Sequence, residues 1–556
     1  MRKIYYYLTL GCLAFAGINS ASGLPAKPGL ITVKQPDGTE IKVRMEGDAF
    51  NHFVYNEKGQ LLSLNEEGFY VESKLTEEEF LQAKERRAVR KNQGLMTKHF
   101  PSIGQQRVLV ILAEFSNSKF KVEEPKDFYY RMLNQVGFNE YGATGSAFDY
   151  FFENSGGKFM PQFDVYGPVT LSRTDSFYGE DDAFGLENNA YQMIIEACEM
   201  LDGEIDFTKY DADNDGIIDN VYVFYAGKGQ ADGGGATTVW PHAGDIYTKL
   251  HQNVSLDGKI LDHYACSNEW QNAKEQPDGI GSFCHEFGHV LGLPDLYSTN
   301  GRAVFHPYYW DIMSLGSYNN DSRTPPNYSS YERYALGWLE PEVLPSGTVT
   351  IEPLGNSNMA YIIPTDIEDE YFLFENRQLN GWDAYLPGHG MLVWHIDYDV
   401  KAWDSNTVNN SATYQAVDLI EADDIKTTDS YAGDPFPGSS NNTQFTYDST
   451  PSLRNWGGRN RDDHTGYAIN NIEETGDGLI KLNVEYNDPA AIDGIMSEIE
   501  NFVFVSGNTI STSENGVKIY DISGRIIATI NAESLSLPSG IYIAVKGDKH
   551  VKFIVR

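Results

Sequence analysis

One short stretch near the middle of the chain carries two histidines, a glutamate and an aspartate at fixed spacing. His285 and His289 are separated by one helical turn, so on a helix both imidazoles would lie on one face, close enough to bind the same metal ion. Glu286 lies beside them and would reach a water on that ion rather than the ion itself. Gly292 can adopt the left-handed conformation that ends a helix, after which the chain could return Asp295 towards the ion.

This ligand set predicts a catalytic zinc site. Two imidazoles and one carboxylate would leave a fourth position open, whereas structural zinc sites are closed by four protein ligands. Glu286 would act as general base towards water and then as general acid towards a leaving amine. A chance His-Glu-x-x-His is expected in roughly 2 % of chains of this composition, and requiring Gly292 and Asp295 as well makes coincidence rarer. The alternatives are a pair of core histidines on a buried helix and, for the third ligand only, a glutamate from elsewhere in the chain.

A second group of oxygen donors surrounds Gly216 in the pattern D-x-D-x-D-G-x-x-D. The candidate donors are Asp211, Asp213, Asp215, Asp219 and the carbonyl of Ile217. Alternating carboxylates on a tight loop suit a hard cation such as Ca²⁺. The helix-loop-helix calcium motif needs an acid at loop position twelve, where Tyr222 stands, so this would be a structural calcium loop of another type. The alternative is a solvated acidic turn.

The zinc-binding stretch resembles the metzincin motif of zinc peptidases, in the variant where an acidic residue replaces the third histidine. Downstream, residues 310–314 (WDIMS) resemble the Met-turn, in which a methionine, here Met313, forms an apolar floor beneath the zinc site. The combination is most similar to the immune inhibitor A family of secreted bacterial metallopeptidases. Further segments similar to that family are 240–242, 331–338, 375–377 and 393–397. The resemblance covers about residues 100–485 and implies an α/β metzincin-like catalytic domain.

The sequence departs from the metzincin pattern in two places. Most metzincins have histidine where Asp295 stands. Some metzincins place a transition-state tyrosine two residues after the methionine, where Leu315 stands here, and Tyr318 is the nearest alternative.

The pro-segment has no cysteine to act as a latch on zinc. Residues 45–48 (MEGD) are distantly similar to the aspartate latch of astacin-like precursors, but an ordinary β-turn is favoured because Gly-Asp is a common turn pair.

The N-terminus predicts export. Basic residues at positions 2 and 3, an apolar run over 4–17 and small residues at 20–22 are typical of a signal peptide. Cys12 leaves a lipoprotein site as an alternative, and no later segment is long and apolar enough to span a bilayer.

The net charge of −37 disfavours nucleic-acid binding. The remaining cysteines, at 198, 266 and 284, either include a disulfide between the last two or are three buried thiols.

The periodicity of the chain predicts a multidomain protein. We expect a signal peptide (1–22), a pro-segment (23–98) ending in a basic linker, an α/β catalytic domain (99–340), a β-rich domain (341–488) and a small C-terminal β-sandwich (489–556). In the catalytic domain we expect strands at 108–115, 159–171 and 221–226 and helices at 146–154 and 187–200. The last segment resembles the C-terminal sorting domains of type IX secretion. This resemblance implies that the type IX secretion machinery is a partner of the protein.

The favoured function is therefore a zinc metalloendopeptidase, made as a zymogen and acting on extracellular proteins outside the bacterial inner membrane. The alternative is a non-catalytic adhesin or glycan-binding protein on a peptidase scaffold. That alternative is disfavoured because a scaffold without activity usually loses Glu286 or one of the histidines, and all are present. A third hypothesis is an amidase that uses the same chemistry on peptidoglycan.

Overall fold

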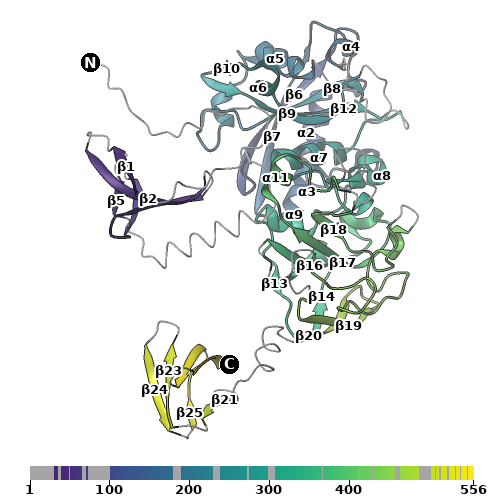
Figure 1. Ribbon diagram of the computed structural model, residues 1–556. Coiled ribbons are helices and arrows are strands. Elements are labelled where there is room, and N and C mark those ends of the chain that lie inside the picture. The colour runs from purple at the N-terminus through teal and green to yellow at the C-terminus, as the bar shows by residue number, and fades with distance from the viewer. Residues whose placement is uncertain are drawn as a thin grey trace. The chain divides into compact units, whose positions relative to one another are not determined.

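The computed structural model describes most of residues 100–486 and parts of the two terminal regions (Figure 1). The gaps in the central region are 180–188, 230–237, 272–274, 298–306, 366, 368, 412, 427–429 and 457–463. The described parts of the terminal regions are 30–34, 39–48, 51–64, 70–72 and the strands between 503 and 555. The chain divides into two compact units, Met1–Glu485 and Tyr486–Arg556. The predicted signal peptide and the basic linker at 77–98 lie outside the described residues.

A five-stranded sheet forms the centre of the region before residue 340. Its spatial order is β7 (Phe159–Thr170), β6 (Gly104–Glu114), β8 (Val221–Lys228), β12 (His263–Trp270) and β9 (His242–Asp245). The first four strands are parallel, whereas β9 runs antiparallel to β12 at one edge. Residues 108–113 of β6 are all apolar and buried on both faces of the sheet, as is usual for a central parallel strand.

Helices cover both faces of this sheet. One face carries α2 (Pro125–Asn134), α3 (Ala147–Asn154) and α7 (Ile280–Val290), and the other carries α5 (Ala190–Leu201). Successive residues of β6 point to opposite sides, so Val110 enters the core beneath α7 and Ile111 enters the core beneath α5. The predicted α/β organisation of this region is confirmed, and α3 begins at Ser146 with a reciprocal capping box to Asp149.

Short elements connect these strands and helices. They are η1 (Glu140–Gly142), α4 (Asp175–Tyr178), η2 (Phe207–Tyr210), α6 (Ile246–Leu250), β10 (Val254–Leu256), β11 (Lys259–Leu261), η4 (Tyr308–Trp310), η5 (Leu315–Tyr318), α8 (Asn319–Ser322) and α9 (Ser330–Ala335). Of these, η5 and α8 pack against α7, and η4 packs against η5. The backbone of η5 lies so close to α7 that a β-carbon on Gly281 would be 2.0 Å from the Ser317 carbonyl oxygen.

The region after residue 340 is rich in strands, as predicted. One sheet has the order β13 (Glu342–Val343), β15 (Tyr361–Pro364), β16 (Glu370–Arg377), β17 (Gly390–Asp397) and β18 (Val417–Leu419). A second has the order β14 (Gly347–Ile351), β20 (Ile480–Tyr486) and β19 (Tyr467–Glu474). The short helices here are α10 (Leu354–Ser357), η6 (Gly381–Tyr385), α11 (Val400–Asp404) and η7 (Tyr431–Gly433).

The hydrophobic core continues across residue 340. Leu373, Trp394 and Trp403 belong to the same buried cluster as Phe287 on α7 and Trp338. The opposite face of β16 packs into a separate core with the three-stranded sheet. The boundary predicted at 340 therefore does not coincide with a break in packing, and the division into separate functional domains stays a prediction.

The strand β16 also carries buried charges towards the α/β region. Arg377 forms ion pairs with Glu375 at 3.0 Å and Asp383 at 2.5 Å, and it donates to the Asn327 carbonyl at 3.0 Å. Glu375 accepts a hydrogen bond from the Ser330 amide at 2.5 Å, at the start of α9. Each charge has its partners, which is the condition for burying such groups without a large cost. These contacts join the two regions by polar as well as apolar interactions.

The described part of the predicted pro-segment is an antiparallel sheet. Its strands follow the chain order β1 (Leu30–Lys34), β2 (Glu40–Asp48), β3 (Asn51–Asn56), β4 (Leu61–Leu64) and β5 (Tyr70–Glu72). Residues 45–48 form the end of β2 and pair with β3 up to the Asp48–Asn51 position. They are strand rather than the β-turn that the sequence favoured, because the ladder occupies their backbone.

The second compact unit consists of two antiparallel sheets. Their orders are β21 (Val503–Ser506), β22 (Thr509–Thr512) and β25 (Ser534–Ser536), and β24 (Ile526–Asn531), β23 (Asn515–Asp521), β26 (Gly540–Lys546) and β27 (Lys549–Val555). Both sheets contribute to one small core that includes Ile510 and Ile519. This confirms a β-rich C-terminal part. Whether it acts as a sorting domain stays a prediction.

Candidate metal centre

The helix α7 places both predicted imidazoles on one side and then ends abruptly. The Gly292 amide donates to the His289 carbonyl and the Leu293 amide donates to the Gly288 carbonyl, both at 2.9 Å. These two bonds define a Schellman C-cap, and Gly292 has the left-handed φ of 98° that this cap requires. The chain therefore reverses after α7, and Asp295 lies opposite the two histidines.

The three predicted ligands converge on one point. The Nε2 atoms of His285 and His289 each lie 3.3 Å from Oδ1 of Asp295. Zinc binds nitrogen and oxygen ligands at about 2.0–2.1 Å, so two ligands of a tetrahedral ion are about 3.3–3.4 Å apart. The spacing of these side chains therefore fits a tetrahedral zinc ion.

Hydrogen bonding fixes which nitrogen of each ring faces that point. Nδ1 of His285 lies 2.7 Å from the Ile312 carbonyl oxygen, and Nδ1 of His289 lies 2.8 Å from that of Leu293. A carbonyl oxygen only accepts, so both Nδ1 atoms carry the proton and both Nε2 atoms are acceptors in the neutral rings. Asp295 Oδ1 is buried and has no hydrogen-bond donor among the described residues. Three acceptors facing one another are stabilised when protons or a metal ion lie between them.

The electrostatics of the cluster also favour positive charge between these three side chains. Burial lowers the pKa of His289, but the Asp295 carboxylate more than offsets this and raises the pKa to about 9. Burial also opposes ionisation of Asp295, yet the charges that His289 and His285 carry when they are protonated lower the pKa of Asp295 far below its usual range. The carboxylate thus favours a positive charge between itself and the two rings, carried by protons or by a metal ion.

Glu286 is placed to handle a proton. Its carboxylate lies within 4.8 Å of the ligand nitrogens of His285 and His289 and is 7 % exposed. It accepts no hydrogen bond from the part of the chain that the structure describes, so its oxygens are available to a water. Burial raises the pKa of Glu286, which brings a carboxylate closer to the range of an effective general base.

The predicted Met-turn packs next to the candidate metal site and forms hydrogen bonds with two parts of it. Met313 is fully buried, and its amide donates to Asp311 at 2.7 Å while its carbonyl accepts from the Leu296 amide at 2.9 Å. The preceding carbonyl, that of Ile312, is the acceptor for His285. The turn therefore contacts the segment of the third ligand and orients one of the histidines.

Two residues at the site were not predicted. The Tyr297 ring lies nearly parallel to that of His285, at 18° with centroids 6.5 Å apart, and its pKa is raised by burial and by the charge of Asp295. Asn406 exchanges two hydrogen bonds of 2.7 Å with Asp295. Tyr297 follows Asp295 closely in sequence and could have been considered, whereas nothing in the sequence connects position 406 to the site. Tyr318, the predicted alternative, is 43 % exposed on η5 and lies near enough to influence the pKa of Tyr297.

The acidic loop brings some of its predicted donors together. Carboxylate oxygens of Asp211, Asp213 and Asp219 lie within 4.8 Å of one another, and burial together with the neighbouring carboxylates raises the pKa of Asp219 to about 7. Asp215 is not in this group and accepts from the Ile217 amide at 2.8 Å. Asp211 is also paired with Lys259, which neutralises part of the charge. The loop resembles a cation site only in part.

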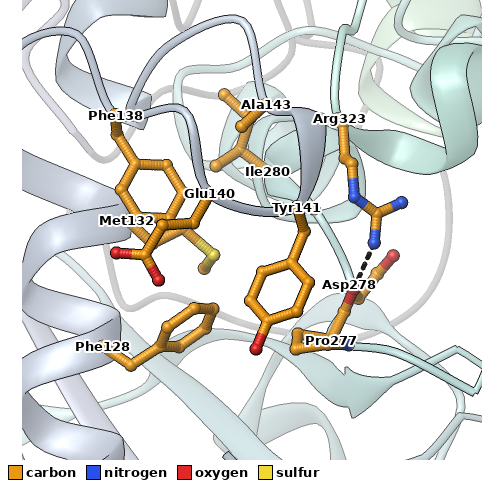
Figure 2. A pocket seen from close by; sticks show the side chains of 11 residues that line it. Phe128, Met132, Phe138, Glu140, Tyr141, Ala143, Pro277, Asp278, Ile280 and Arg323 are labelled. Atoms are coloured by element: carbon orange, nitrogen blue, oxygen red, sulfur yellow. Dashed lines mark hydrogen bonds between the residues drawn. The ribbon is translucent and has the colours of Figure 1, made fainter.

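A small pocket lies at the N-terminal end of α7 (Figure 2). Its floor is apolar, with Phe128 and Phe138 among the lining residues, and Arg323 at its rim donates to the Pro277 carbonyl at 2.7 Å. None of the residues of the metal cluster lines it.

All three described cysteines, at 198, 266 and 284, are buried free thiols, which agrees with the thiol alternative. No helix among the described residues is long and apolar enough to cross a membrane.

Comparison with known proteins points to one class. Residues 101–339 match the family model of the immune inhibitor A peptidase M6 catalytic domain, which supports assigning this region to that metallopeptidase family. Among curated proteins, the chain is similar to the pre-pro-metalloprotease PrtV of Vibrio cholerae serotype O1, with 26 % identity over 303 residues. It is also similar to immune inhibitor A of Bacillus thuringiensis subsp. alesti, with 26 % identity over 266 residues.

Each match covers only part of this chain and only part of the relative. The alignment with PrtV covers 45 % of this chain and 33 % of the relative, and that with immune inhibitor A covers 41 % and 39 %. The chain thus spans about a third of the length of the curated relatives it matches. The likeness supports a metallopeptidase with a bound metal and a protein substrate for the matched region. The activity of the whole chain is a matter for proposal.

Proposed function

We propose that this protein is a secreted, zinc-dependent endopeptidase that hydrolyses peptide bonds of extracellular proteins. The observation that carries the proposal is the convergence of three acceptor atoms, from His285, His289 and Asp295, beside the carboxylate of Glu286. A site of this composition holds zinc with one coordination position left over. The family match of residues 101–339 supports the same class of activity.

The roles of the chain's own residues follow from the geometry. Zinc, when bound, supplies Lewis-acid polarisation of a carbonyl and lowers the pKa of water. Glu286 accepts the proton of the attacking water and then delivers it to the leaving amine, because its oxygens face the cluster without another hydrogen-bond partner in the described chain. The carbonyls of Ile312 and Leu293 hold the two rings in the tautomer that presents Nε2.

Export, latency and calcium are further parts of the proposal. The signal peptide directs the chain out of the cell, residues 23–98 keep it latent, and the C-terminal unit addresses it to type IX secretion machinery. The basic linker at 77–98 is the place for the activating cut. A calcium ion on the Asp211–Asp219 loop would offset the burial and the repulsion between carboxylates that together raise the pKa of Asp219.

A casein zymogram tests the activity directly. The secreted chain, before and after light trypsin treatment, should clear casein with zinc and fail to do so after chelation. His285→Ala should lose both zinc and activity, whereas His389→Ala, at a half-exposed histidine paired with Glu474, should keep both. Clearing by a verified zinc-free protein would contradict the proposal. Zinc binding without proteolysis, together with retention on immobilised glycans, would favour the adhesin alternative.

A further inference from the structure

The third candidate ligand is held by a residue far away in the sequence. Asn406 accepts a hydrogen bond from the Asp295 amide through Oδ1 and donates from Nδ2 to Asp295 Oδ2, each at 2.7 Å. The orientation of this amide is unambiguous, because a backbone N–H can only donate and therefore must face the amide oxygen. Its nitrogen then necessarily faces the carboxylate.

This pair of bonds decides how Asp295 can act. Its Oδ2 atom is occupied by Asn406, so only Oδ1 remains directed at the two imidazoles. Asp295 is 5 % exposed, and the donor to its outer oxygen fixes the rotation of the carboxylate. A carboxylate without this contact could rotate and present either oxygen, or neither, to the ion.

The segment that carries Asn406 is itself firmly attached. It follows α11, where Trp403 donates to the Tyr331 hydroxyl at 2.7 Å. Three residues later, Asn409 donates to the carbonyls of Leu296 and Val417, both at 2.9 Å. Asn406 has a left-handed φ of 52°, a conformation that asparagine tolerates better than most residues. The loop between β17 and β18 thus contacts Asp295 and Leu296 through two of its asparagines.

We propose that Asn406 is a positioning residue for Asp295, and that residues 400–409 of the strand-rich region complete the metal centre. This inference rests on the proposed zinc site. It means that the region matched by the family model, residues 101–339, contains all three proposed ligands but not Asn406, which binds both the amide and the carboxylate of the third one. Removing that group should weaken zinc binding by about 10–100-fold, as is typical for residues that orient metal ligands.

The test compares three variants of the full-length secreted chain. Asn406→Gly removes the side chain and tolerates the left-handed backbone, whereas Asn406→Asp keeps the size but replaces the donor with an acceptor that repels Asp295. Asn441→Gly, at an exposed asparagine with the same left-handed φ of 52° outside residues 400–409, is the matched control. The measurements are the dissociation constant of zinc from competition with a chelating dye, and the visible absorption spectrum of the Co²⁺-loaded protein, which reports ligand geometry.

We expect Asn441→Gly to match the wild type and both Asn406 variants to bind zinc at least tenfold more weakly with an altered cobalt spectrum. Wild-type affinity and an unchanged spectrum in either folded Asn406 variant would overturn the inference. A wild-type chain that binds no zinc would instead overturn the proposed function. Thermal unfolding in chelator identifies a variant that does not fold, and the other Asn406 variant then decides the question.

Discussion

Gly288 and Met313 are in direct contact between the helix of the histidines and the turn beneath it. A β-carbon on Gly288 would lie 2.6 Å from the Met313 sulfur and 3.2 Å from its terminal methyl carbon. The absence of a side chain at Gly288 therefore lets the turn approach α7 closely enough for the Ile312 carbonyl to reach His285. The glycine in the middle of the zinc-binding stretch is thus explained by packing.

We predict that Gly288→Ala displaces Met313, weakens zinc binding by about tenfold and destabilises the fold by about 1–3 kcal/mol. The double variant with Met313→Ala should recover part of both losses, since the clash is removed. Zinc titration and thermal unfolding measure the two effects. Gly203→Ala is the control, because a β-carbon there meets no atom within 4 Å. Additive effects in the double variant would contradict the packing explanation.

Glu286→Gln should keep zinc and lose activity. The amide has nearly the size of the carboxylate but cannot accept the proton, and general acid–base groups contribute about 10²–10⁴-fold to rate. The measurement is kcat on a fluorogenic peptide together with the zinc content of the same sample. Full activity at full zinc occupancy would remove Glu286 from the mechanism and require another base.

A buried pair of carboxyl groups should make stability depend on pH. Asp311 and Glu332 are both fully buried, and burial raises the pKa of Asp311 to about 6 and that of Glu332 well above its usual value. Groups with raised folded pKa values stabilise the protein at low pH and lose that contribution as pH rises through those values. We predict that the melting temperature falls between pH 5 and pH 8 for this reason.

Glu332→Gln should reduce that fall. The glutamine amide can donate to Asp311 at any pH, so no proton has to be held between the two groups. Melting curves at pH 5 and pH 8 measure the difference, and the exposed Glu340→Gln is the matched control. A variant that loses as much stability as the wild type over this range would show that another group governs the pH dependence.

Calcium should raise the melting temperature if the acidic loop binds it. Asp213→Asn should abolish the increase, because its carboxylate is one of the three that lie together. Magnesium at the same concentration serves as the control for ionic strength. If calcium has no effect on the wild type and Asp213→Asn stabilises the apo protein, the loop is an acidic turn whose charges are balanced in part by Lys259.

Much of the site is encoded locally and could be predicted from the sequence. The spacing of His285 and His289 determines that they share a helix face, and Gly292 determines where the helix ends. The strands and helices of the α/β region were predicted because apolar runs and capping residues act over a few neighbouring positions. The position of Met313 beneath α7, by contrast, was expected only from the family resemblance. No local pattern predicts which turn packs under which helix.

The sequence by itself thus determined the spacing of the two histidines on α7 and the glutamate beside them, because these depend on helical periodicity; that they are metal ligands and a general base stays a proposal. Only the tertiary structure decided that Asn406 holds Asp295 and that the hydrophobic core passes through residue 340. Asn406 and Asp295 are 111 positions apart, and their contact exists only because the sheet containing β17 and β18 packs against the α/β region. Hydrogen bonds at that separation follow from the packing of whole elements, which no local pattern specifies.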